Sequence, residues 1–157
     1  MVGSKSEHQG IIKDGAKLVN AVSNSVVPKF TIVVGNSYGA GNYAMCRKAY
    51  DPRLIFAWPS AEIAVMSGQS ASKVLLQIEE SKRKSAKQSL SENDRKPLLE
   101  EIEHKYAHST SPYYAAARLW TDGVIDPVET RKHLSLGIEM ANNNSQIEPF
   151  SLGLLQV

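Results

Sequence analysis

The stretch VVGNSYGAGNYAM, residues 33–45, decides how this sequence is interpreted. A β-branched run ends at Gly35, three small or turn-forming residues follow, and two further glycines precede a possible first helical turn. A strand, a glycine-rich turn and a helix in this order serve three kinds of site. These are a serine nucleophile, a dinucleotide-binding loop and a set of backbone amides that binds an anion.

Length and composition limit the alternatives. The chain has 157 residues, of which 42% are apolar and 22% charged, as expected for one globular domain. Its 18 basic and 16 acidic residues give no dominant basic face, so a nucleic-acid partner is not expected. The single cysteine, Cys46, excludes an internal disulfide and a cysteine-rich zinc site. No run approaches the roughly 18 apolar residues of a membrane helix. These features predict a soluble intracellular protein without a membrane partner.

Hydrophobic periodicity predicts strands that alternate with helices in the first half of the chain. The predicted elements are a helix over 10–24, a strand over 26–34, a turn and short helix to about residue 47, strands over 54–58 and 62–66, and a helix over 68–84. Such alternation favours an α/β fold. The charged zone 79–105 reads as two solvated amphipathic helices.

Two predicted helix caps, each followed by a proline, lie in the last third of the chain. Ser111 followed by Pro112 predicts a helix start, and this helix is expected to run to about Trp120. Residues 124–125 form a short strand at most. Asp126 followed by Pro127 repeats the cap, and Glu129 is placed to close a capping box at the start of the last helix.

The first interpretation of the glycine-rich stretch is a nucleophile elbow. GNSYG, residues 35–39, fits G-x-S-x-G with Ser37 as the nucleophile of an α/β-hydrolase-like esterase. The acid would be Asp122 or Asp126, and the base His133. Against this, Asp126 is better explained as a helix cap, and His133 lies in the helix that it caps.

The second interpretation is a dinucleotide-binding, Rossmann-like module. GAGNYA, residues 39–44, fits G-x-G-x-x-G/A with Gly39, Ala40 and Gly41 at its turn. Glu62 lies near the expected distance for the ribose carboxylate. However, that acid should end a strand, whereas Glu62 lies between two apolar runs, and the residues NSY lengthen a turn that should be tight.

The third interpretation needs no side-chain chemistry. Small residues at a helix start let the first backbone N–H groups point at a negatively charged oxygen, which the helix dipole also favours. If that oxygen belongs to an enolate, the site is an oxyanion hole whose donors are the amides of Ala40 and Gly41. The simpler alternative is a glycine-rich turn that only packs a helix tightly against a sheet.

A longer match distinguishes these interpretations. The runs VPKFTIVVGNSYGAGNYAMCRKAYDPRLIFAWPSAEIAVMSGQSA, SPYYAAARLWTDGVIDPVETR and FSLGLLQV resemble, in order, the carboxyltransferase (β) subunit of biotin-dependent acyl-CoA carboxylases, most closely the methylcrotonoyl-CoA carboxylase type. The resemblance implies a crotonase/ClpP-like superhelix of strand–strand–helix units. It also implies that residues 1–157 are the later part of the second of two such domains, without that domain's early strands and without the first domain.

The resemblance also implies a reaction. The carboxyl group of carboxybiotin, borne on a separate carrier domain, passes to an acyl-CoA, and the biotin ureido oxygen becomes enolate-like and takes the substrate proton. The hole for that oxygen maps onto Ala40 and Gly41, with Tyr38, Gly39 and Tyr43 as substrate-binding neighbours and no metal. Coenzyme A thioester is the substrate, and the first domain supplies most of its pocket, so the isolated chain is expected to be inactive.

The same resemblance implies partners and a cellular compartment. A biotin carboxylase/biotin-carrier subunit and a homo-oligomer, a hexamer of full-length β subunits, are expected. The cytoplasm is the expected location, or the mitochondrial matrix in a eukaryote.

Overall fold

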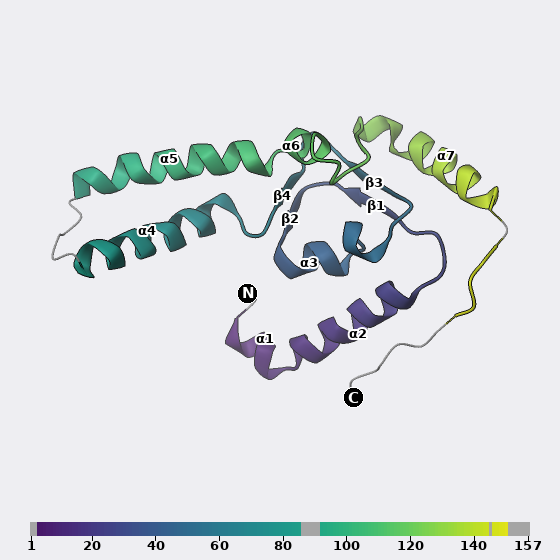
Figure 1. Ribbon diagram of the computed structural model, residues 1–157, viewed down its shortest axis with the longest axis horizontal. Helices are drawn as coiled ribbons and strands as arrows, with labels where there is room; N and C mark the ends of the chain where they lie inside the picture. The colour runs from purple at the N-terminus through teal and green to yellow at the C-terminus, as the bar shows by residue number, and fades with distance from the viewer. Residues whose placement is uncertain (1–2, 86–91, 145, 151–157) are drawn as a thin grey trace.

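The computed structural model describes residues 3–85, 92–144 and 146–150, and parallel strands form its centre (Figure 1). One sheet has three strands in the order β1 (Phe30–Val33), β3 (Leu54–Ala57) and β5 (Gly123–Val124). A second sheet pairs β2 (Asn36–Tyr38) with β4 (Glu62–Ala64). All three strand pairs are parallel, which confirms the α/β prediction.

Two strand–strand–helix units build these sheets. β1 continues into β2 and then into helix α3 (Gly39–Ala44), whereas β3 continues into β4 and then into α4 (Gly68–Ser85). The units pair in register, so that Phe30 faces Leu54 in one sheet and Asn36 faces Glu62 in the other. The chain therefore turns the same corner twice, as the crotonase-like expectation requires.

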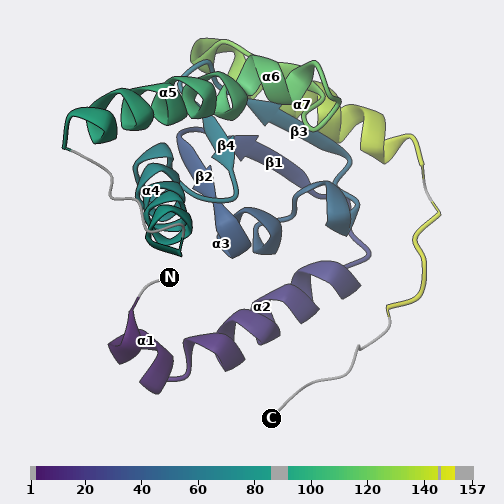
Figure 2. The ribbon, with the colours of Figure 1, turned by 60° about the vertical axis from the view of Figure 1, so that its left-hand side comes forward.

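The remaining helices surround this centre (Figures 1 and 2). They are α1 (Ser4–His8), α2 (Ile11–Asn24), α5 (Glu92–Thr110), α6 (Pro112–Ala116) and α7 (Thr130–Asn142), with 3-10 turns η1 (Lys48–Tyr50) and η2 (Pro127–Glu129). α4 and α5 lie side by side in opposite directions and extend away from the sheets. Among the described residues, no helix combines the length and apolar composition needed to cross a bilayer.

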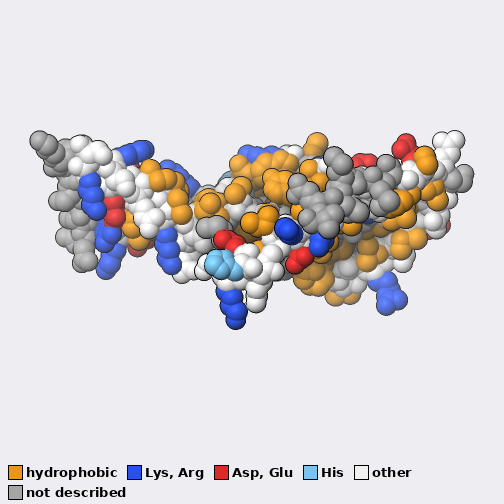
Figure 3. All heavy atoms as spheres, turned by 90° about the horizontal axis from the view of Figure 1, so that it is seen from below, with side chains coloured by type: hydrophobic (Ala, Val, Ile, Leu, Met, Phe, Trp, Pro, Cys, Tyr) orange, Lys and Arg blue, Asp and Glu red, His pale blue; other side chains and the backbone are white. Residues whose placement is uncertain are grey.

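The core is small and lies between the strands and α6. Ile55 and Ala57 of β3 are fully buried, as is Ala115 of α6. Much apolar surface stays open: Ile12 of α2 is 74% exposed, and hydrophobic side chains gather over the central part of the face seen from below, whereas Lys and Arg side chains project at the α4–α5 end (Figure 3).

Three local predictions are wrong for identifiable reasons. Residues 36–38 are a strand and not part of a turn, because they pair with β4 after the corner at Gly35, whose carbonyl accepts from the Glu62 amide at 3.2 Å. The helix after Ser111 ends at Ala116 and not near Trp120. Leu119 adopts a left-handed conformation, with φ of 58°, which a non-glycine residue does not adopt inside a right-handed helix.

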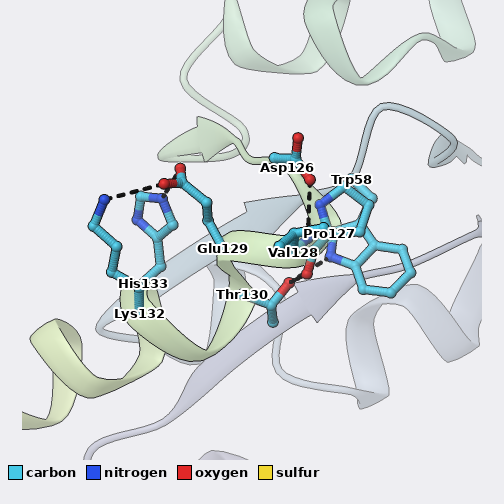
Figure 4. A network of polar contacts seen from close by, with 8 residues as sticks. All are labelled: Trp58, Asp126, Pro127, Val128, Glu129, Thr130, Lys132 and His133. Carbon is cyan, nitrogen blue, oxygen red and sulfur yellow. Dashed lines mark hydrogen bonds and ion pairs between the residues drawn. The ribbon is translucent and has the colours of Figure 1, made fainter.

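The third wrong prediction is the capping box at Glu129. Asp126 does act as a cap, since its Oδ1 accepts from the Val128 amide at 2.9 Å, but the element it starts is the turn η2 (Figure 4). Glu129 instead pairs with Lys132 at 3.1 Å and with His133 at 3.8 Å on α7. The side-chain hydroxyl of Thr130, at the start of α7, accepts a 3.0 Å hydrogen bond from the Trp58 indole and so ties α7 to the end of β3.

Candidate functional site

The junction between β2 and α3 is held in an unusual conformation. Tyr38 is extended, with φ of −122° and ψ of 146°, and Gly39 then adopts φ of +63°. A Cβ atom on Gly39 would lie 3.3 Å from the carbonyl oxygen of Val65, so this position needs glycine both for its backbone angle and for the close approach of β4's continuation. The glycine therefore fixes where the amides that follow are placed.

Ala40 and Gly41 form the first turn of α3 and are both exposed. Within the described ranges no side chain caps this helix start, and a Cβ atom on Gly41 would meet nothing within 4 Å. Amides in a first helical turn lack intrahelical acceptors. The junction thus offers uncapped N–H donors beside open space, which suits a ligand with a negatively charged oxygen.

Tyr38 turns its hydroxyl toward the neighbouring strand. It donates a hydrogen bond to the Glu62 carboxylate, and burial together with Glu62 raises the Tyr38 pKa to about 12. Both residues line a cavity of about 460 Å³ next to Tyr106 and Thr110 of α5. The phenol therefore stays protonated at neutral pH and acts as a hydrogen-bond donor, not as a base.

Tyr43 lies on another side of α3. It is 52% exposed and lines a cavity of about 250 Å³ with Asn42 of the same helix, Ile63 of β4 and Trp120. The structure thus places the five predicted site residues within or beside one short helix, with Tyr38 and Tyr43 in separate cavities. Which of them contacts a ligand remains a prediction.

The serine triad is not assembled. Ser37 Oγ donates to Asn42 Oδ1 at 2.8 Å, and both candidate acids have structural partners. Asp126 caps η2, and Asp122 Oδ2 accepts from the Ile55 amide at 2.7 Å. His133 lies on α7, with its ring centroid 5.2 Å from that of Phe56.

Asp122 consequently has a structural role that substitution can measure. Asp122→Ala removes the acceptor of the Ile55 amide on the buried central strand, and we expect the free energy of unfolding to fall by about 1–3 kcal/mol. The matched control is Lys48→Met, which removes only the 3.2 Å partly exposed ion pair to the same carboxylate. We expect this control to cost below about 1 kcal/mol in denaturant unfolding. Equal losses from both variants would contradict the assigned role.

The dinucleotide interpretation also lacks its acid. Because residues 36–38 are a strand, a strand does run directly into the glycines, contrary to the sequence-based objection. However, Glu62 begins β4 and does not end a strand, and its carboxylate accepts from Tyr38. A ribose carboxylate is expected at the end of a strand. In the part of the chain that the structure describes, no group of three or more His, Cys, Asp or Glu side chains is arranged to hold a metal.

Comparison with known proteins identifies the family. The family model described as "Carboxyl transferase domain" matches residues 1–152. The chain belongs to the carboxyl transferase domain family. Solved structures of other proteins have a fold similar to that of this carboxyl transferase chain. The transcarboxylase 12S subunit, solved as a hexamer, aligns with a TM-score of 0.82 and 34% identity, and the Pseudomonas aeruginosa geranyl-CoA carboxylase β subunit with 0.79 and 40%. Each alignment covers 100% of this chain and 29% of the other.

Curated relatives agree with this membership. The chain is 48% identical over 145 residues to a probable mitochondrial methylcrotonoyl-CoA carboxylase beta chain of Drosophila melanogaster, and 48% over 143 residues to the mitochondrial beta chain of Arabidopsis thaliana. These matches cover 92% and 91% of this chain but 25% and 24% of the relatives. The carboxyl transferase chain thus spans about a quarter of their length.

Sequence reasoning missed one residue at this site. Arg47 follows α3, is only 6% exposed and lines the Tyr43 cavity. No sequence signal marks it, because it stands beside a second cation, Lys48, and arginine usually indicates a surface position.

Proposed function

We propose that the protein containing this chain transfers a carboxyl group from carboxybiotin to an acyl-CoA, and that this chain supplies the biotin side of the active site. In this proposal residues 1–157 are the later part of the second carboxyltransferase domain. The observation that carries it is the uncapped helix start at Ala40 and Gly41, set by the left-handed Gly39, in a member of the carboxyl transferase family. Relatives named for methylcrotonoyl-CoA and geranyl-CoA carboxylation support the reaction class.

The residues present leave room for a group that carries a negatively charged oxygen. Gly41 has open space where a side chain would stand, and Gly39 could not carry one without meeting the Val65 carbonyl. When bound, carboxybiotin would supply the carboxyl group, and its ureido oxygen would gain negative charge as that group leaves. The amides of Ala40 and Gly41 would donate to that oxygen, and the α3 dipole would add to their effect. Tyr38 stays protonated and borders the junction, and Tyr43 forms a pocket wall.

The partners and compartment in the proposal follow the family. A biotin carboxylase/biotin-carrier subunit delivers the carboxylated biotin, and the full-length subunits assemble as a homo-oligomer, in line with the hexamer of transcarboxylase 12S. We place the enzyme in the cytoplasm of a bacterium or the mitochondrial matrix of a eukaryote. The relatives from fly and plant are named as mitochondrial.

Ser37→Ala separates backbone from side-chain chemistry. In the full-length enzyme we expect kcat for carboxyl transfer to change less than about fivefold, because the donors are amides and loss of one partly buried hydrogen bond costs only about 1 kcal/mol. Ser60→Ala, which removes a comparable 3.0 Å bond to the Val34 carbonyl, is the matched control. A loss of several orders of magnitude for Ser37→Ala alone, with normal thermal unfolding, would support a serine nucleophile instead.

A further inference from the structure

The cavity beside Tyr43 has mainly apolar walls and one buried charge, Arg47. It encloses about 250 Å³, and its walls include the aromatic side chains of Tyr43 and Trp120 and the aliphatic side chains of Ile63 and Val65. This volume is below the range typical of sites for drug-sized ligands. It therefore suits a small molecule or one end of a larger one, and an apolar body fits its walls.

Arg47 supplies the charge. The residue is 6% exposed, and its Nη1 has no hydrogen-bond partner among the described residues. Burial lowers the pKa of the guanidinium, which nonetheless remains a cation because its ordinary value is so high. A buried charge without a partner is strongly destabilising. An anion that contacted the guanidinium from the cavity would offset that cost.

The backbone is strained on both sides of the cavity. Cys46 adopts φ of 62° immediately before Arg47, and Leu119 adopts φ of 58° immediately before Trp120. Non-glycine residues in this conformation are uncommon and persist where the surrounding structure holds them, often at ligand sites. A strained residue therefore fixes the position of each of the two side chains that would contact an anion and its apolar body, Arg47 and Trp120.

The remaining charges at the cavity restrict the kind of anion. Lys48 also lines it, but its ammonium already pairs with Asp122 at 3.2 Å. One guanidinium then faces mainly apolar walls. Such a site matches a single carboxylate, which a guanidinium binds with two parallel hydrogen bonds, better than a phosphate, which needs more donors.

We propose that this cavity binds a small organic carboxylate, with Arg47 binding the carboxylate and Tyr43 and Trp120 contacting its apolar body. Binding as such requires neither biotin nor coenzyme A. Only the natural ligand rests on the proposed function: a carboxyltransferase has a carboxylate on both its donor and its product.

Calorimetric titration of the protein containing this chain tests the site. Benzoate and benzamide share a flat apolar body and differ in charge, so benzoate should bind at least tenfold more tightly. Arg47→Met should weaken benzoate binding at least tenfold, to the benzamide level, while keeping or raising thermal stability because it removes an unpaired buried charge. Arg47→Lys, which keeps the charge but loses the planar fork, should weaken it severalfold. The control Arg53→Met removes an exposed arginine outside this cavity and should change affinity less than twofold.

Three results would overturn the proposal. They are equal affinity for benzoate and benzamide, an unchanged benzoate affinity in Arg47→Met, or inorganic phosphate bound as tightly as benzoate. Because the titration contains no acyl-CoA and no carboxybiotin, charge-selective binding can succeed where carboxyl transfer fails, and the reverse. The two proposals are therefore tested separately.

Discussion

Gly41→Val in the full-length enzyme is expected to lower kcat roughly a hundredfold or more. This corresponds to about 3 kcal/mol, which is the cost of losing one oxyanion-hole donor. A branched side chain at this position would extend into the open space beside the amide and hold the charged biotin oxygen away from the N–H donor. The effect should appear in kcat, because an interaction made only with the charged oxygen stabilises the transition state and not the ground state. KM for the acyl-CoA and for the biotin carrier should change little.

Folding should tolerate this substitution. A Cβ atom on Gly41 meets nothing within 4 Å, so thermal unfolding of Gly41→Val should match that of the wild type. Gly15→Val is the matched control, because Gly15 of α2 is also free of contacts and lies outside the site. A Gly41→Val enzyme that folds normally and turns over at the wild-type rate would show that these glycines only allow tight packing.

Gly137→Val is expected to lower the free energy of unfolding by about 1–3 kcal/mol or more, the usual range for overpacking a close-packed contact. Gly137 lies on the buried side of α7, where a Cβ atom would stand 2.7 Å from Phe30 Cε1 and 3.2 Å from Leu54 Cδ1. Either α7 moves away from β1 and β3 or the Phe30 ring leaves its place.

The same control applies in denaturant unfolding. Gly15→Val should change stability by less than about 0.5 kcal/mol, because valine is slightly better than glycine inside a helix and nothing obstructs it. If Gly137→Val and Gly15→Val had the same stability, the close packing of α7 on the sheet would be wrong.

Local patterns predicted the elements whose stability is local. The helix at α2, the strands β1, β3 and β4, and the caps at Ser111 and Asp126 follow from periodicity and cap chemistry, and the structure confirms them. The strand β2 was not predictable in this way. Asn36 and Ser37 have low strand propensity, and only their pairing with β4, more than twenty residues away, makes them extended.

In the candidate site, too, features set by the local sequence were predictable and features set by distant residues were not. The glycine spacing predicts an uncapped helix start, because φ above zero and close backbone approach are properties that glycine itself provides. Arg47 could not be predicted, because the cavity that it lines also takes Ile63 of β4 and Trp120, which lie far from it in the sequence. The two short glycine motifs indicated partners that have other roles in the fold: Asp122 accepts from a strand amide, and Glu62 accepts from Tyr38.

A labelled-carboxyl assay tests the proposed reaction most directly. The full-length protein, supplied with carrier-bound biotin carrying a ¹⁴C-carboxyl group, is incubated in turn with methylcrotonoyl-CoA, propionyl-CoA and geranyl-CoA, and the acyl-CoA fraction is counted. We predict that label moves to at least one of these thioesters and that Gly41→Val slows the transfer roughly a hundredfold. Intact thioesters that gain no label, or thioesters hydrolysed in a Ser37-dependent manner, would contradict carboxyl transfer by this chain.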